Sequence, residues 1–93
     1  MDETILMRTC LTQLAALGYE FDEEEGYPVD ITKSLSTDTW SVDIILDWDA
    51  NYDDWISAVN CTITNELIVQ KCVLLERDEE GDVIEKLRYS AQK

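Results

Sequence analysis

The segment from Thr39 to Asp49 has an apolar residue at every second position, and this alternation constrains the fold more than any other feature of the chain. One side of the segment carries Trp40, Val42, Ile44, Leu46 and Trp48. The other side carries Ser41, Asp43, Ile45, Asp47 and Asp49. Since successive side chains of a strand point to opposite faces, the pattern predicts a strand with one face in the core and the other largely in water.

The N-terminal segment shows the longer period of an amphipathic helix. Its apolar residues recur three or four positions apart: Leu6, Met7, Cys10, Leu11, Leu14 and Leu17. Residues with this spacing share one face of a helix, so we predict a helix from Glu3 to Leu17. Gly18 follows the last periodic residue and is typical of a helix C-terminus.

Further short strands are predicted on both sides of the central one. Pro28 precedes a strand that ends near Ser34, and Trp55–Thr64, Leu67–Glu76 and Val83–Tyr89 follow. A short edge strand over residues 19–22 is an additional option, and for residues 52–60 a helix that begins at Asn51 remains an alternative to the strand.

The order of these elements predicts one α+β domain over residues 1–93, with the helix packed on an antiparallel meander of four to five strands. Short connections favour antiparallel neighbours, and one helix against one sheet face closes a two-layer domain. The helix should contribute its apolar side chains Leu6, Cys10, Leu14 and Leu17. The sheet should meet them with Trp40, Val42, Ile44, Leu46 and Val59.

The charge of the chain is strongly negative and unevenly distributed. There are 21 acidic and 7 basic residues among 93, a formal net charge of −14. Residues 19–66 hold thirteen acids and one base, whereas residues 67–93 hold six acids and five bases. Such a surface repels nucleic acids and anionic membranes, so we predict no direct contact with either and a basic nucleic-acid-binding protein or complex as the partner.

The acids of the first half predict the partner-binding surface. On a regular strand Asp43 and Asp47 would point the same way roughly 13 Å apart, and Asp49 would extend the row. DNA carries one charge per ~3.4 Å along each strand, so several acidic segments together are needed to imitate it. The predicted partner-binding residues are Asp22, Glu23, Glu24, Glu25, Asp43, Asp47, Asp49, Asp53 and Asp54, with Tyr52 and Trp55 as aromatic anchors. The alternative interpretation of the tryptophans is that Trp40, Trp48 and Trp55 are all core residues and none of them binds a partner.

In its size, its charge of −14 and its clusters Glu23-Glu24-Glu25 and Asp53-Asp54, the chain resembles the small acidic inhibitors encoded by phages, the anti-CRISPR and anti-restriction proteins. The resemblance implies a non-catalytic protein that blocks a nuclease or surveillance-complex surface where DNA or guide RNA would bind. It is a likeness of class and transfers no particular residue.

Catalytic, metal and cofactor sites are not predicted. The chain has no His, so a Ser or Cys nucleophile lacks its usual base and zinc lacks its commonest nitrogen ligand. Asp47, Asp49 and Asn51 match the start of a calcium loop, but Tyr52 stands where that loop needs glycine, which leaves a divalent-cation-binding domain as a weaker alternative. The three cysteines, Cys10, Cys61 and Cys72, are predicted to be reduced, buried thiols of a cytoplasmic protein.

A further alternative is an adaptor, an immunity protein or a secretion-chaperone-like binding module. The passage from a helix through Leu17, Gly18 and Tyr19 into an antiparallel sheet is similar in outline to type III secretion chaperone-like domains. Such a protein would be a monomer or homodimer that holds a client on exposed apolar surface, for which Ile45, Ile56 and Ile68 are candidates. Binding that is insensitive to salt would favour this alternative.

Overall fold

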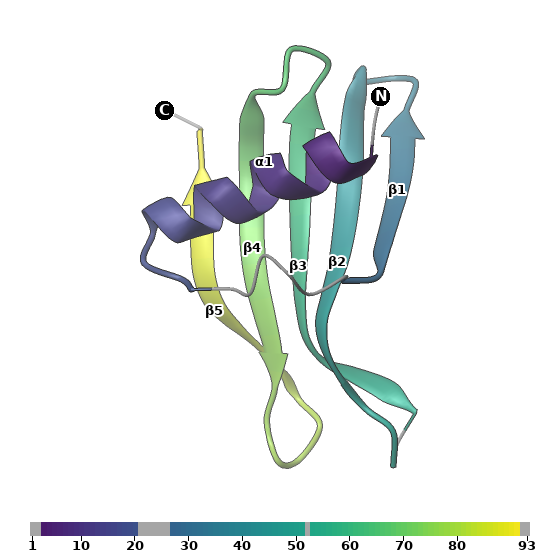
Figure 1. The fold of residues 1–93 in the computed structure, drawn as a ribbon, viewed down its shortest axis with the longest axis vertical. Helices are drawn as coiled ribbons and strands as arrows, with labels where there is room; N and C mark the ends of the chain where they lie inside the picture. The colour runs from purple at the N-terminus through teal and green to yellow at the C-terminus, as the bar shows by residue number, and fades with distance from the viewer. Residues whose placement is uncertain (1–2, 21–26, 52, 92–93) are drawn as a thin grey trace.

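The computed structural model describes residues 3–20, 27–51 and 53–91, which form one helix and a five-stranded sheet (Figure 1). The elements in chain order are α1 (Glu3–Ala16), β1 (Val29–Ser34), β2 (Thr39–Asp49), β3 (Asp54–Thr64), β4 (Val69–Arg77) and β5 (Val83–Ser90). Each strand pairs antiparallel with its neighbours in sequence, in the order β1-β2-β3-β4-β5. The predicted α+β fold with a meander sheet is confirmed.

The helix ends where glycine was expected to end it. Gly18 has a φ of 102°, a left-handed conformation that costs glycine little because it has no Cβ. The Gly18 N–H donates to the Ala15 carbonyl at 3.0 Å and the Tyr19 N–H to the Leu14 carbonyl at 3.1 Å. This pair of bonds is the Schellman motif, which satisfies the last carbonyls of the helix.

The core lies between α1 and one face of the sheet. Three helix residues spaced by one turn, Leu6, Cys10 and Leu14, are fully buried, as are Val42 and Ile44 of β2. Leu17, predicted to join them, lies beyond the end of α1 and is 39% exposed. The prediction is wrong there because the helix ends at Ala16 and the Leu17 N–H bonds the Leu14 carbonyl at 2.9 Å, three residues back, so Leu17 no longer follows the α-helical face.

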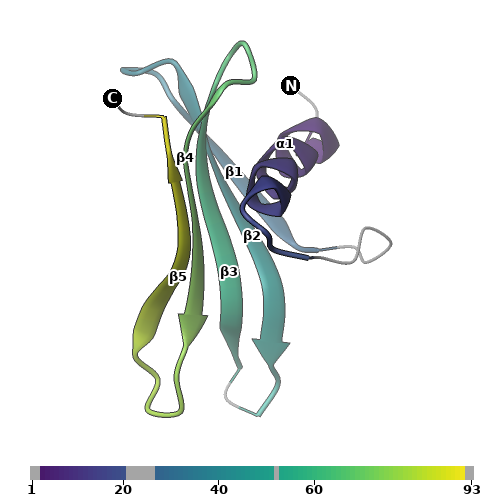
Figure 2. The ribbon, with the colours of Figure 1, turned by 90° about the vertical axis from the view of Figure 1, so that its left-hand side faces the viewer.

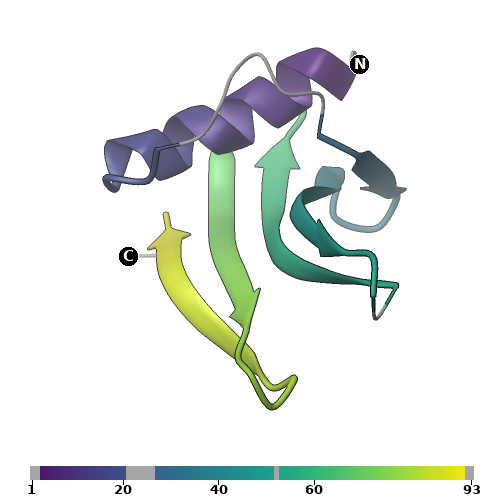
Figure 3. The ribbon, with the colours of Figure 1, turned by 60° about the horizontal axis from the view of Figure 1, so that its bottom comes forward.

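The helix crosses only part of the length of the strands. Figures 1 and 2 show α1 lying across one half of the sheet, while the β2–β3 and β4–β5 hairpins extend beyond it at the other end. Figure 3 shows α1 covering a single face, and no other helix or strand of residues 3–20, 27–51 and 53–91 covers the opposite one. In this part of the chain no helix is long and apolar enough to cross a membrane.

The central strand departs from its predicted alternation near its end. The pairing of β2 with β3 shifts between Ile45 and Asp47 and again between Asp47 and Trp48. Trp48 was predicted to lie on the core face but is 49% exposed, because it follows these shifts of register in the hairpin end that extends beyond α1. The alternative that all three tryptophans are core residues is therefore wrong for Trp48.

Two other local predictions are settled by the strand assignments. Residues 54–60 belong to β3, so the alternative of a helix that begins at Asn51 is wrong over that range. Tyr19 and Glu20 are not in a strand, so the optional edge strand does not form at these positions, and its remaining residues, 21 and 22, lie outside the described residues.

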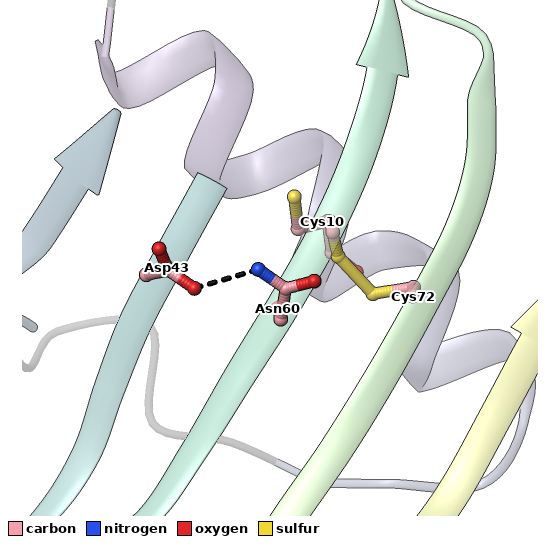
Figure 4. Close-up of a disulfide and its surroundings, with 5 residues drawn as sticks. Cys10, Asp43, Asn60 and Cys72 are labelled. Carbon is pink, nitrogen blue, oxygen red and sulfur yellow. Dashed lines mark hydrogen bonds between the residues drawn. A yellow bond between two sulfur atoms is a disulfide. The ribbon is translucent and has the colours of Figure 1, made fainter. Parts of the chain in front are cut away.

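The cysteines are all buried, as predicted, but two of them are joined. Cys61 of β3 and Cys72 of β4 are register partners on adjacent strands and form a disulfide (Figure 4). Cys10 of α1 is a free thiol, and its carbonyl oxygen lies 3.7 Å from the sulfur of Cys72. The prediction of three reduced thiols is wrong because the antiparallel register places side chains opposite each other that are 11 residues apart in sequence.

Candidate protein-binding surface

The meander places two acidic hairpin ends at the same end of the molecule. The chain reverses between β2 and β3 and again between β4 and β5, and both reversals lie at the lower end of the sheet in Figures 1 and 2. Eight carboxylates lie in these segments: Asp47, Asp49, Asp53, Asp54, Asp78, Glu79, Glu80 and Asp82. We call this set the acidic end. The sole basic residue within these two segments of the described chain is Arg77.

The β4–β5 turn is organised by one of its own acids. The Oδ1 atom of Asp78 accepts hydrogen bonds from the backbone N–H groups of Glu80 and Asp82, each at 2.9 Å. Gly81 has a φ of 88° and its N–H donates to the Asp78 carbonyl at 3.0 Å. Asp78 is therefore used to hold the turn, whereas the side chains of Glu79 and Glu80 are exposed and have no hydrogen bond or ion pair among the described residues.

In the β2–β3 hairpin, too, one carboxylate accepts a backbone hydrogen bond within the turn. Asp49 and Asp54 are register partners, which places two like charges opposite each other. The Oδ1 atom of Asp49 accepts the N–H of Asn51 at 2.8 Å, and Asp53 adopts a left-handed φ of 53°. These two local features turn the chain while leaving the charge of Asp53 exposed.

Arg77 links the two hairpins across the acidic end. Its Nη2 atom lies 3.2 Å from Oδ2 of Asp54, and its guanidinium carbon lies 4.4 Å from the centre of the Trp55 ring. The guanidinium thus interacts at once with a carboxylate and with an aromatic face. Trp55, predicted to be an anchor for a partner, is half-buried under this arginine. One positive charge cannot neutralise eight negative ones, so the acidic end keeps a large net negative charge.

One carboxylate of the acidic end, Asp47, acts on Tyr19, which follows the end of α1. Burial raises the pKa of the Tyr19 hydroxyl above its ordinary value, and Tyr27 raises this pKa further. The charges of Glu76 and Asp47 act in the same direction, since a negative charge nearby disfavours a second one.

Asp43, a predicted binding residue, lies away from the acidic end. Figure 4 shows it on the side of the sheet that faces away from α1, where its Oδ1 atom accepts a hydrogen bond from the amide of Asn60 at 2.6 Å. Its register partner in β1 is Asp30, so two acids face each other there. The predicted uniform row through Asp43, Asp47 and Asp49 is interrupted because the strand pairing shifts on both sides of Asp47.

The opposite end of the sheet neutralises its charge locally. Lys33 pairs with Asp38 at 3.2 Å, donates to the Asn65 side chain at 3.1 Å and lies 4.8 Å from the centre of the Trp40 ring. Hydrogen bonds from Lys33 and then from Asn65 hold the pKa of Asp38 below its ordinary value. On β5 the hydrogen bond from Arg88 lowers the pKa of Glu85 in the same way. Asp38 and Glu85 are thus each paired with a base, whereas seven of the eight carboxylates of the acidic end have no ion pair among the described residues.

The structure brings together some predicted residues and adds others. Asp47, Asp49, Asp53, Asp54 and Trp55 lie in one hairpin at the acidic end. Asp22, Glu23, Glu24, Glu25 and Tyr52 lie outside the described residues. The acids of the β4–β5 turn were missed because they were averaged with the nearby bases of residues 67–93. The predicted meander already contained the signal, since its alternate turns meet at one end.

The acidic residues do not form a metal centre in the described part of the chain. In residues 3–20, 27–51 and 53–91 no three His, Cys, Asp or Glu side chains converge in a way that could hold a metal ion. Instead, Asp47 and Asp49 each accept a backbone N–H group. In comparisons with known proteins, no family, no curated protein and no solved structure matches this chain.

Proposed function

We propose that this chain is a non-catalytic inhibitor that binds a basic nucleic-acid-binding surface of another protein through its acidic end. The observation that supports this function is that two hairpins place eight carboxylates and a single arginine at the same end of the sheet. Clustered like charges raise the free energy of the compact state, and a cationic surface would relieve that cost on binding. The same field would accelerate association with such a surface.

A surface that binds DNA or guide RNA has the charge that the acidic end requires. Such surfaces use Lys and Arg to contact phosphates, so an acidic protein can occupy them in place of the nucleic acid. The chain itself would bind neither nucleic acid nor an anionic membrane. On this proposal it is a cytoplasmic inhibitor of the anti-CRISPR or anti-restriction type, active as a monomer or a homodimer.

The test requires acids whose replacement does not disturb the fold. Asp54 holds Arg77, Asp43 holds Asn60, and Asp78 holds its turn, so reversing these charges would confuse binding with folding. Glu79, Glu80 and Asp82 are exposed side chains of the acidic end with no such bond among the described residues. We choose Glu79→Lys, Glu80→Lys and Asp82→Lys together as the test variant.

The control variant carries the same change of net charge elsewhere: Glu3→Lys, Glu20→Lys and Glu66→Lys. Wild-type protein and both variants are immobilised, and nucleic-acid-binding proteins captured from the native host are purified and titrated with duplex DNA or their own guide RNA. We expect the nucleic acid to displace the wild type, the control to bind nearly as well as the wild type, and the test variant to lose most binding. Equal losses for the two variants, or a complex that nucleic acid leaves intact, would reject the proposal.

One observation favours the binding-module alternative. The exposed apolar side chains Ile5 and Leu67, with the buried Val69, line a shallow groove between α1 and the β3–β4 connection, at the end away from the acidic hairpins. Of the three isoleucines predicted to form a client surface, Ile68 is exposed, and Ile45 and Ile56 are half-buried. Capture that persists at high salt and is lost on Leu67→Ser would support this alternative, because apolar contacts are not screened by salt.

A further inference from the structure

The β2–β3 hairpin contains the dipeptide Asp-Trp twice, with the same local geometry. The Oδ1 atom of Asp47 accepts the backbone N–H of Trp48 at 2.9 Å. The Oδ1 atom of Asp54 accepts the backbone N–H of Trp55 at 2.8 Å. Trp48 and Trp55 are register partners, so the two dipeptides lie side by side across the hairpin. In each dipeptide the aspartate therefore uses one carboxylate oxygen for the backbone of the tryptophan and keeps its second oxygen for another partner.

One of the two dipeptides already binds an arginine from within the chain. Arg77 places Nη2 3.2 Å from the second oxygen of Asp54 and its guanidinium carbon 4.4 Å from the centre of the Trp55 ring. Both interactions suit a guanidinium in particular, because it is planar, permanently charged and weakly hydrated. The Asp54–Trp55 dipeptide is thus an arginine-binding site that is occupied by an arginine of the same chain.

The Asp47–Trp48 dipeptide offers the same carboxylate and indole groups, but no arginine of the described chain is bound to it. Among the described residues, no Lys or Arg forms an ion pair with Asp47 or stacks on Trp48. Asp47 is exposed and the Trp48 side chain is 49% exposed, in a strand whose other large apolar residues are at least half-buried. An exposed indole whose neighbour in sequence is an exposed carboxylate, at an end with strong negative charge, is complementary to a cationic side chain.

We propose that Asp47 and Trp48 bind an arginine side chain of the partner protein, in the way that Asp54 and Trp55 bind Arg77. This inference rests on the proposed function for the source of the arginine, which is the basic surface that the acidic end covers. The ring of Trp48 stacks on the guanidinium, and the carboxylate of Asp47 accepts its N–H donors. The site selects arginine over lysine because an ammonium group offers no plane to stack.

The test uses a short blocked peptide of alternating arginine and glycine and its lysine counterpart, titrated into ¹⁵N-labelled full-length protein. The indole N–H signals of the tryptophans report binding, and Trp48→Leu identifies the signal of Trp48. We expect this signal to shift saturably, with the arginine peptide bound about threefold more tightly than the lysine peptide. Trp48→Leu should weaken binding about fivefold, the ordinary effect of losing an exposed cation–π contact.

A matched pair of charge variants separates this site from general attraction. Asp47→Asn and Glu66→Gln each remove one negative charge, and Glu66 lies in the β3–β4 connection at the other end of the sheet. Asp47→Asn should weaken peptide binding about threefold and Glu66→Gln hardly at all. Equal effects, or shifts confined to the signals of Trp40 and Trp55, would overturn the inference. The titration needs no partner protein, so its failure is distinguishable from a failure of the capture and displacement experiment.

Discussion

Removal of Arg77 is predicted to loosen the acidic end, since this residue joins the two hairpins there. Arg77 contacts Asp54 of β3 through an ion pair and Trp55 through its stacked guanidinium. A double-mutant cycle isolates each contact: Arg77→Gln is combined with Asp54→Asn in one cycle and with Trp55→Leu in the other.

The structure sets the expected size of each coupling energy. Two unit charges 3.2 Å apart attract by about 1.3 kcal/mol in water. The Asp54 side chain is 47% exposed, so side-chain entropy and solvent screening reduce its contribution to about 0.5 kcal/mol. The stacked contact with Trp55 is expected to contribute about 1 kcal/mol. The Nε atom of Arg77 is buried without a hydrogen-bond partner among the described residues, which lowers the net contribution of Arg77 to the unfolding free energy. This cost is the same with either partner residue, so it cancels from both coupling energies.

The assay is urea unfolding followed by far-ultraviolet circular dichroism, because fluorescence would change with the loss of Trp55. In 0.5 M salt, roughly the concentration that shortens the Debye length to half its physiological value, the coupling of Arg77 to Asp54 should fall and its coupling to Trp55 should persist. Couplings below about 0.3 kcal/mol in both cycles, the usual error of additivity, would refute the view that Arg77 ties the hairpins together.

Three further predictions concern the scaffold. Leu14→Ala should lower the unfolding free energy by about 3 kcal/mol, because the side chain is fully buried. Leu17→Ala, at a site that is 39% exposed, should lower it by less than about 1 kcal/mol. Equal losses in urea titrations would contradict the position of α1. Burial raises the pKa of the Cys10 thiol from 9.0 to about 12, so its contribution to stability is complete below pH 9 and is lost as the pH rises toward 12. The difference in unfolding free energy between wild type and Cys10→Ala should therefore decrease as the pH rises above 9. A difference that stays constant over this pH range would exclude the effect. Intact mass spectrometry should find the native chain two hydrogen atoms lighter than the reduced chain because Cys61 and Cys72 are joined, whereas a mass with three free thiols would disprove the bond.

The fold was largely predictable because its elements are encoded over short distances in the sequence. Leu6, Cys10 and Leu14 recur at the period of a helix, and Gly18 provides the residue that a left-handed cap requires. Each strand has its own alternation or apolar run, and short connections leave an antiparallel meander as the simplest arrangement. These signals depend on residues a few positions apart, so they can be read without knowledge of the tertiary structure.

Several of the predictions that needed correction depended on contacts between distant segments. The alternation of apolar residues placed Trp48 on the core face, but it could not show how far along the strands α1 covers that face. The spacing of Cys61 and Cys72 matched no known pattern, and only the pairing register of β3 with β4 brings them together. The pairing of Trp48 with Trp55 also arises from register, because the two residues are seven positions apart in sequence and opposite each other in the sheet.

Residue patterns along the chain are enough to specify the helix, the strands, their order and a net charge of −14. They do not specify which carboxylates are neighbours: the turn with Asp78, Glu79 and Glu80 belongs to a segment of nearly balanced charge, yet it lies at the same end as Asp53 and Asp54. The energy between two charges depends on their separation in space and on the solvent between them, and not on the number of residues that connect them, so this part of the electrostatics depends on how the strands pair.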